Sequence, residues 1–390
     1  MLAACGSDSD DPTLTPFDGI AVVQSKGGGS SQIEFTDGKS IIQSEFLPQI
    51  DDDYAVFAHG EFFYQLGRGS NDSIQKYHID NPQLGYYPND GYILKEIVDG
   101  QPTSANPYNM AFLNDGSNTA VITRYGQAES WVVDLNAQSF EDFVIHKLDL
   151  SHHDDSSSET DSDPEADMVF ISGNRAFITM QNLDGWTPDN AAKVAVFDTT
   201  TWQEIDTDPS TDGVQAISMT LKNHQSGAIH GNTIYLGSLI YANATGGLEK
   251  INTDTFATEV ITDEKAVSQV AVDSLGNVFF ADYAGWQDNS LYAVNDDNSI
   301  GLVSEALTSL FITTLTSPGD SIWMATSATD NDTNNLIQRI DSSLDYTEPK
   351  TIEEAVLSSV QNALQVINIA FLESEKEVPE TPEEPVLEEL

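Results

Sequence analysis

One pattern recurs seven times along this chain and limits how the chain can fold. Each copy holds an apolar segment, a polar loop rich in Gly, Asn, Asp or Ser, and a second segment in which apolar and polar residues alternate. The clearest parts of the copies are residues 20–35, 62–79, 120–135, 176–198, 233–252, 278–295 and 322–341. Their loops begin on average about 50 residues apart. The alternation of β-branched and aromatic residues predicts short β-strands in every copy.

This repeat predicts an all-β fold, a seven-bladed β-propeller, because four short strands in about 40–57 residues are the unit of one blade. The first strands of the blades are expected at residues 54–58, 109–113, 167–171, 216–221, 268–272 and 310–314. The first copy lacks such a strand, but residues 366–372 (VINIAFL) match residues 109–113 (NMAFL). We therefore expect the ring to be closed by a C-terminal strand that joins the N-terminal blade and covers an open edge.

The fourth copy carries a resemblance to a known group of propellers. Residues 176–205 contain the strand Phe177-Ile178-Thr179 and, after a loop, the run Val194-Ala195-Val196-Phe197-Asp198-Thr199. This pattern resembles the YVTN-type repeat of the quinoprotein amine dehydrogenase-like propellers. The resemblance implies the fold and little about activity, because propellers host many unrelated functions.

The N-terminus holds the one cysteine of the chain. Cys5 follows Leu2 and two alanines. This run resembles the lipobox of a bacterial lipoprotein, and the resemblance implies that Cys5 carries the lipid anchor. Gly6 after the cysteine implies an outer-membrane lipoprotein of a Gram-negative bacterium, on its periplasmic or cell-surface side. No run of 18 apolar residues is present, so no membrane-spanning helix is expected.

The whole chain divides into three parts on this reading. Residues 1–16 form a lipobox remnant and acidic tether, and residues 17–373 form a single seven-bladed propeller. Residues 374–390 are rich in Pro and Glu, which predicts a disordered acidic tail. A chain with 15 Lys and Arg against 63 Asp and Glu has a formal charge of −48. It is not expected to bind nucleic acid, because that requires many cations to neutralise phosphates. We expect a monomer.

The loops that follow the second strand of each blade are expected on one face of the ring, together with the mouth of the central channel. They hold the few candidate ligand-binding residues: Lys26, Arg68, Arg124, Tyr125, Trp186, Tyr241, Tyr283 and Trp286. Arg binds planar anions through paired hydrogen bonds, and Tyr and Trp offer surfaces for stacking. These residues predict an electropositive, ring-lined pocket. The alternative is that Arg68 and Arg124 form structural ion pairs.

Metal binding and catalysis give weaker signals. His152-His153-Asp154-Asp155 is the densest group of metal ligands, but adjacent residues on one loop chelate poorly, so a metal site and a solvated loop both stay open. His224 and His230, predicted to flank a turn at Gly227, have an expected structural role. Structural Ca²⁺ at Asp51–Asp53, at Asp163, Glu165 and Asp167, or at Asp330–Asp332 is an open alternative. No catalytic residue and no other cofactor are expected.

These observations favour a non-enzymatic binding lipoprotein. It would present a propeller face to a small anionic or aromatic ligand, siderophore-like or an acidic glycan, or to a partner such as an outer-membrane transporter in nutrient or iron uptake. Two alternatives remain: a metal-dependent hydrolase or lyase on a propeller scaffold, and an adhesive or structural surface protein.

Overall fold

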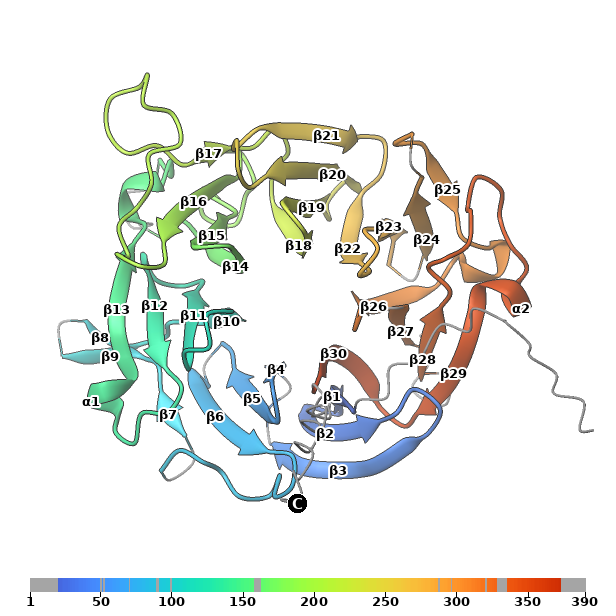
Figure 1. The fold of residues 1–390 in the computed structure, drawn as a ribbon, viewed down its shortest axis with the longest axis horizontal. Coiled ribbons are helices and arrows are strands. Elements are labelled where there is room, and N and C mark those ends of the chain that lie inside the picture. The colour runs from blue at the N-terminus through green and yellow to red at the C-terminus, as the bar shows by residue number, and fades with distance from the viewer. Residues whose placement is uncertain are drawn as a thin grey trace, which may run out of the picture.

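Seven four-stranded antiparallel sheets stand around a central channel in the computed structural model, each as one blade of a propeller (Figure 1). The structure describes residues 20–49, 51, 53–69, 71–88, 91–98, 100–157, 163–286, 288–295, 297–319, 321–327 and 335–372. The predicted all-β, seven-bladed fold is confirmed. The predicted tether of residues 1–16 and the tail of residues 374–390 lie outside the described residues.

Each blade runs from an innermost strand at the channel to an outermost strand at the outer edge of the ring. Blade 1 holds β30 (Gln365–Phe371), β1 (Ala21–Gly27), β2 (Ser30–Thr36) and β3 (Ile41–Gln49); blade 2 holds β4 (Tyr54–His59), β5 (Phe62–Gly67), β6 (Ser73–His78) and β7 (Tyr92–Ile93). Blade 3 holds β10 (Pro107–Phe112), β11 (Thr119–Arg124), β12 (Glu129–Asp134) and β13 (Val144–Asp149); blade 4 holds β14 (Ala166–Ser172), β15 (Arg175–Met180), β16 (Lys193–Asp198) and β17 (Ile217–Ser218).

The other three blades follow the same order. Blade 5 holds β18 (His224–His230), β19 (Thr233–Ile240), β20 (Thr245–Asn252) and β21 (Thr258–Thr262); blade 6 holds β22 (Val267–Val272), β23 (Val278–Gly285), β24 (Asp288–Val294) and β25 (Ile300–Leu302). Blade 7 holds β26 (Phe311–Thr316), β27 (Ile322–Ser327), β28 (Asn335–Ile340) and β29 (Val356–Asn362). A small hairpin, β8 (Glu96–Val98) and β9 (Gln101–Thr103), and two single-turn helices, α1 (Phe140–Phe143) and α2 (Ile352–Ala355), complete the described elements.

The C-terminal strand closes the ring as predicted. β30 pairs with β1 in antiparallel register, and the backbone N–H of Leu372 donates to the carbonyl of Ile20 at 3.0 Å. Asn368 in β30 also accepts a hydrogen bond from the backbone N–H of Val56 in blade 2 at 2.7 Å. The first blade therefore combines both ends of the described chain, which leaves no open edge at this position.

Side chains of the innermost strands join neighbouring blades around the channel. Besides the contact of Asn368, the hydroxyl of Ser226 in β18 accepts from the backbone N–H of Val270 in β22 at 2.9 Å. Behind this inner ring, apolar side chains of adjacent sheets form clusters between the blades, with residues such as Phe177 and Trp323 fully buried. Since both faces of the middle strands are covered, runs such as Ala120–Ile122 are buried without interruption.

One predicted first strand is wrong. Residues 216–221 do not begin blade 5, because Ile217 and Ser218 form β17, the outermost strand of blade 4, paired with Val194 and Lys193. The innermost strand of blade 5 is β18, whose sequence HQSGAIH is polar because one side of it faces the channel. Gly227 accordingly lies within a strand rather than a turn. A Cβ there would come within 2.7 Å of the Phe170 ring of blade 4.

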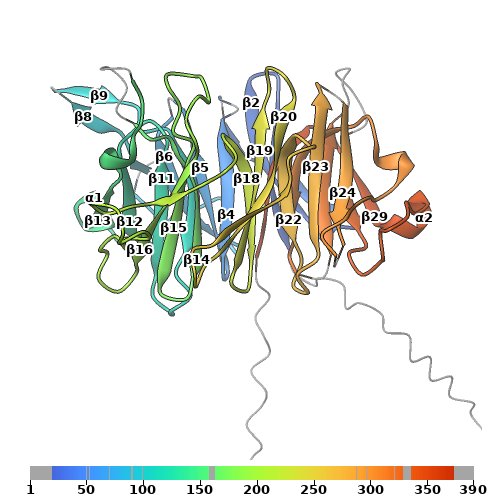
Figure 2. The ribbon, with the colours of Figure 1, turned by 90° about the horizontal axis from the view of Figure 1, so that it is seen from above.

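The two faces of the propeller differ in what they carry. The loops after the second strand of each blade, with the β8–β9 hairpin, lie on one face, which is uppermost in Figure 2 and is called the upper face here. The described ends, Ile20 and Leu372, lie on the opposite face, because β1 begins there and runs toward the upper face. No helix in the described part of the chain is long and apolar enough to cross a membrane.

Candidate functional site

The central channel holds a cavity of about 520 Å³ to which the innermost strands of all seven blades contribute. Its wall is made of uncharged polar side chains, such as Gln225, Gln269 and Asn368, and aliphatic ones, such as Val270. Among the described residues that line it, Arg68 is the only charged side chain. The protein has a net charge of −48, whereas the described lining of this cavity holds one arginine and no carboxylate. The cavity wall is therefore much less acidic than the chain as a whole.

Arg68 follows β5 and is held in place by two contacts. Its Nε donates to Oδ1 of Asp53 at 2.9 Å, and its guanidinium carbon lies 5.0 Å from the centre of the Tyr108 ring. The side chain remains 26% exposed. Arg68 therefore forms the structural ion pair that was the alternative interpretation, and it also lines the cavity. Burial raises the pKa of Tyr108, while the charge of Arg68 acts in the opposite direction.

Several aromatic side chains lie on the upper face, at or beside the ends of first and second strands, and one of them, Tyr108, lines the cavity. Tyr108 packs against Tyr125 with ring centres 5.3 Å apart, and Tyr241 meets Tyr283 edge-on at the same separation. Burial raises the pKa of Tyr241, and the nearby phenols of Tyr108 and Tyr283 raise it further. Tyr241 therefore lies close to a member of each pair. Trp286 packs at a tilt against Phe311, where the innermost strand of blade 7 begins, with ring centres 4.6 Å apart. These rings are called the aromatic rim.

Arg124 does not take part in this site. Arg124 is the last residue of β11 in blade 3, and Arg68 directly follows the equivalent strand β5 in blade 2. Unlike Arg68, Arg124 has a fully buried side chain. Its Nη2 pairs with Oε1 of Glu96 at 3.2 Å, and the guanidinium lies 3.8 Å from the Trp131 ring. The prediction that Arg68 and Arg124 share one pocket is therefore wrong, because Arg124 forms a buried ion pair with Glu96 of the β8–β9 hairpin. Burial lowers the pKa of Arg124, and Glu96 opposes this change.

Two further candidates lie away from the cavity lining. Lys26 is in β1, where its backbone pairs with Ser31 and Gln365. Trp186 is 87% exposed in the loop between β15 and β16. Neither residue lines the channel cavity. Of the eight candidates, only Arg68 is among the described residues that line the cavity. Tyr125, Tyr241, Tyr283 and Trp286 lie at or just after the upper ends of second strands without lining it, and Arg124 is buried.

Sequence reasoning missed the residues that form the cavity wall. Tyr108 lies in the innermost strand β10, and Gln225, Gln269 and Asn368 lie in β18, β22 and β30. The signal was present in the sequence, because a polar side chain in an otherwise apolar innermost strand must face the channel. The expected candidates all lie in the loops after the second strands, so these residues of the innermost strands were not predicted.

A largely buried polar network links blades 3, 4 and 5. The Tyr125 hydroxyl donates to Oε1 of Gln181 at 2.8 Å, and Nε2 of Gln181 donates to Oδ2 of Asp167 at 3.1 Å. Burial raises the pKa of Asp167 to about 6, although Thr179 and Gln181 donate hydrogen bonds to its carboxylate. His224, predicted to be structural, pairs its Nε2 with Oε1 of buried Glu249 at 2.9 Å.

The predicted Ca²⁺ positions are largely engaged with protein donors. Asp53 binds Arg68, Asp167 accepts from Thr179 and Gln181, and Glu165 accepts from the backbone N–H of Leu183 at 2.8 Å. Asp52 and residues 330–332 lie outside the described residues. One group of at least three potential metal ligands is found among the described residues, and it lies at the outer edge of blades 3 and 4, away from the channel cavity.

No protein-family model matches this sequence, and no curated protein matches it. Several solved structures share its fold. A putative 6-phosphogluconolactonase from Bacteroides fragilis superposes with a TM-score of 0.55 at 12% identity, over 93% of this chain and 100% of that one. A functionally unknown protein from Desulfotomaculum acetoxidans has a TM-score of 0.54 at 11% identity, over 92% and 100%. Hydrazine synthase of Kuenenia stuttgartiensis has a TM-score of 0.52 at 13% identity, over 88% and 100%. These similarities show a β-propeller fold and nothing finer.

Proposed function

We propose that this protein is a non-enzymatic binding protein that takes a small acidic ligand at the mouth of its central channel. One observation carries the proposal: Arg68 is the only charged side chain among the described residues that line the cavity of a chain with net charge −48. The volume of about 520 Å³ lies in the range of small-molecule sites. The ligand best suited is an acidic sugar or a siderophore-like aromatic acid. Both carry a carboxylate, on a polyhydroxylated body in the first case and on a flat ring in the second.

Each part of the site has a task in this proposal. The guanidinium of Arg68 binds the carboxylate through charge-assisted hydrogen bonds, with Asp53 and Tyr108 fixing its orientation. The aromatic rim stacks on the body of the ligand. Uncharged donors and acceptors such as Gln225 and Gln269 bind its hydroxyl groups at no cost in charge repulsion.

Binding is tested by titrating the purified protein under calorimetry with three probes: galacturonic acid, 2,3-dihydroxybenzoate, and galactose, which is the neutral counterpart of the first. An acidic probe should bind and the neutral one should bind more weakly. Arg68→Ala should weaken binding by about 10–100-fold, as expected for losing a charged hydrogen bond of about 1.5–3 kcal/mol. Tyr108→Ala should also weaken it. Lys39→Ala, which removes an exposed cation on the opposite face, is the matched control.

Two results would refute the binding site. One is that no acidic probe binds the wild-type protein. The other is that binding occurs but survives both Arg68→Ala and Tyr108→Ala while the variants remain folded.

We also propose that the protein is anchored to the outer membrane through Cys5 and works beside a transporter in that membrane. The arrangement of the described chain supports this, because the chain begins on the face opposite the channel mouth. A tether from that face leaves the mouth turned away from the lipid. Palmitate labelling of this chain, expressed behind a lipoprotein signal sequence in a Gram-negative host, should require Cys5 and disappear in Cys5→Ser. Labelling of that variant, or no labelling of the wild type, would contradict the anchor.

A further inference from the structure

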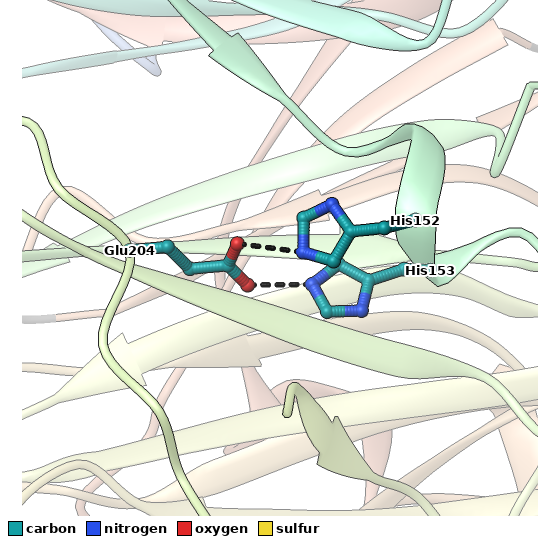
Figure 3. A group of neighbouring side chains, drawn as sticks. All are labelled: His152, His153 and Glu204. Atoms are coloured by element: carbon teal, nitrogen blue, oxygen red, sulfur yellow. Dashed lines mark hydrogen bonds and ion pairs between the residues drawn. The ribbon is translucent and has the colours of Figure 1, made fainter. Parts of the chain in front are cut away.

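A second site lies at the outer edge of the ring, between blades 3 and 4, and shares no residue with the lining of the channel cavity. His152 and His153 sit in a 3₁₀ turn directly after β13, and Glu204 lies in the segment between β16 and β17 (Figure 3). We propose that these three side chains form a binding site for a divalent first-row transition metal, for which Zn²⁺ is the appropriate probe.

Both imidazole rings present the same nitrogen to one carboxylate. Nε2 of His152 lies 2.9 Å from Oε2 of Glu204, and Nε2 of His153 lies 2.5 Å from Oε1 (Figure 3). The ring centres of the two histidines are 4.0 Å apart. One ligand atom from each residue falls within a group no wider than 4.8 Å. A single ion can therefore reach all three side chains.

The geometry needs only a small opening to accept the ion. Zn²⁺ binds imidazole nitrogen at about 2.0–2.1 Å and carboxylate oxygen at about 2.0–2.2 Å, so tetrahedral ligands stand about 3.3 Å from one another. Each nitrogen–oxygen contact must then widen by less than about 1 Å, which a rotation of the Glu204 carboxylate supplies. Two imidazoles and one carboxylate form a ligand set that suits Zn²⁺ better than Ca²⁺ or Mg²⁺, and the fourth position is left for water.

The surrounding structure holds the three ligands in place. The side chains of His153 and Glu204 are only 5% and 10% exposed. The carbonyl of His153 accepts a hydrogen bond from Nζ of Lys193 at 2.9 Å, and Asp155 pairs with the same amine at 2.6 Å. Glu204 is fixed by a backbone bridge to Phe197 in blade 4. Because the two histidines come from blade 3, a bound ion would fasten two neighbouring blades at their outer edge.

Two adjacent histidines on one loop would chelate poorly by themselves, and Glu204 changes this. It enters from the next blade and approaches both rings at once. Without a metal the same contacts are plain hydrogen bonds. The experiment therefore separates a metal site from a structural contact and from adventitious binding to the many carboxylates.

The test uses the full chain in a Cys5→Ser background, so that a thiolate cannot bind the metal. The protein is treated with a chelator and titrated with Zn²⁺ in millimolar Mg²⁺, which occupies sites made only of oxygen ligands. After desalting, one Zn²⁺ per chain should remain. The Co²⁺-loaded protein should show the intense visible absorption of a tetrahedral site with nitrogen ligands. Bound Zn²⁺ should also raise the melting temperature, because it binds only the folded state.

Substitutions assign the site to these residues. His152→Ala, His153→Ala and Glu204→Gln should each weaken Zn²⁺ binding by at least 100-fold. His146→Ala removes an exposed histidine from strand β13, just before the 3₁₀ turn, and should leave the affinity unchanged. His152 is partly exposed, so His152→Ala is expected to fold normally even if His153→Ala does not. The proposal is overturned if the wild type retains no stoichiometric Zn²⁺, or if His152→Ala binds it as tightly as His146→Ala does.

Discussion

Replacing Lys76 by methionine should remove a cost in folding stability that is present at neutral pH and disappears at high pH. Lys76 lies in β6 with only 1% of its surface exposed. Its Nζ lies 4.1 Å from the centre of the Phe62 ring and 4.4 Å from that of Tyr86. It donates hydrogen bonds to the carbonyl of Leu135 at 3.1 Å and to Oδ1 of Asn136 at 3.0 Å, both in blade 3.

The size and sign of the effect follow from the pKa. Burial lowers the pKa of Lys76 from 10.5 to about 8. At about 1.36 kcal/mol per pKa unit, the folded state disfavours the charged amine by about 3 kcal/mol. Below pH 8 both the folded and the unfolded chain are protonated, so this cost is present in full. Between pH 8 and 10.5 the unfolded chain binds more protons than the folded one, so the free energy of unfolding rises with pH.

Urea unfolding followed by tryptophan fluorescence, at intervals between pH 7 and 10.5, measures this contribution. The free energy of unfolding of the wild type, minus that of Lys76→Met, should increase by about 3 kcal/mol across the window. Other titrating groups are common to both proteins and cancel in the difference. Burial raises the pKa values of the nearby Tyr64 and Tyr87, so these phenols stay protonated. The exposed Lys39→Met is the control and should show no such trend. A wild-type-minus-variant difference that stays flat with pH would refute the reasoning.

Three further substitutions test the closing strand, the buried network and the packing of the blades. Ile369→Ala in β30 should lower the free energy of unfolding by about 2–4 kcal/mol in urea titrations, because it leaves a cavity where the ring closes. In the wild type, the raised pKa of Asp167 makes the folded state bind a proton more tightly than the unfolded state, so the free energy of unfolding falls by about 3 kcal/mol as the pH rises from 3.8 to 6. Asp167→Asn should abolish this fall. Melting curves of the variant between these pH values that match those of the wild type would contradict the prediction. Gly227→Ala should cost about 1–3 kcal/mol by calorimetry, since its Cβ would meet the Phe170 ring at 2.7 Å, and an unchanged melting temperature would show that blade 4 can yield.

The sequence predicts the ring of blades well because each sheet must bury both of its faces against its neighbours. Apolar strands such as Ala120–Ile122 recur for that reason, and the closing strand of residues 365–371 keeps the same character. The innermost strand of blade 5 is harder to find, because the side of it that faces the channel carries polar residues. The polar strand β18 was therefore missed, and the more apolar residues 216–221 were assigned in its place.

The site could be predicted only where a residue's surroundings come from its own blade. Arg68 and Arg124 occupy similar places in neighbouring blades, yet the β8–β9 hairpin supplies Glu96 to one of them and buries it. Nothing in the short sequence of that hairpin indicates this. Glu204 is likewise one of 63 acidic residues, and only the backbone bridge to Phe197 places it against His152 and His153.

The arginines explain why the channel mouth differs from the rest of the surface. Arg68, Arg124, Arg175 and Arg339 lie over the rings of Tyr108, Trp131, Phe256 and Trp323 in that order. A guanidinium stacks well on an aromatic face and remains charged when it is partly desolvated. Within the described lining of the channel, only Arg68 reaches the cavity. Since the Debye length is about 8 Å at physiological ionic strength, an acid bound at the axis is largely screened from charges on the outer blades. The proposed ligand should therefore carry one carboxylate on a larger uncharged body, because a second one would meet no described cation in the cavity wall.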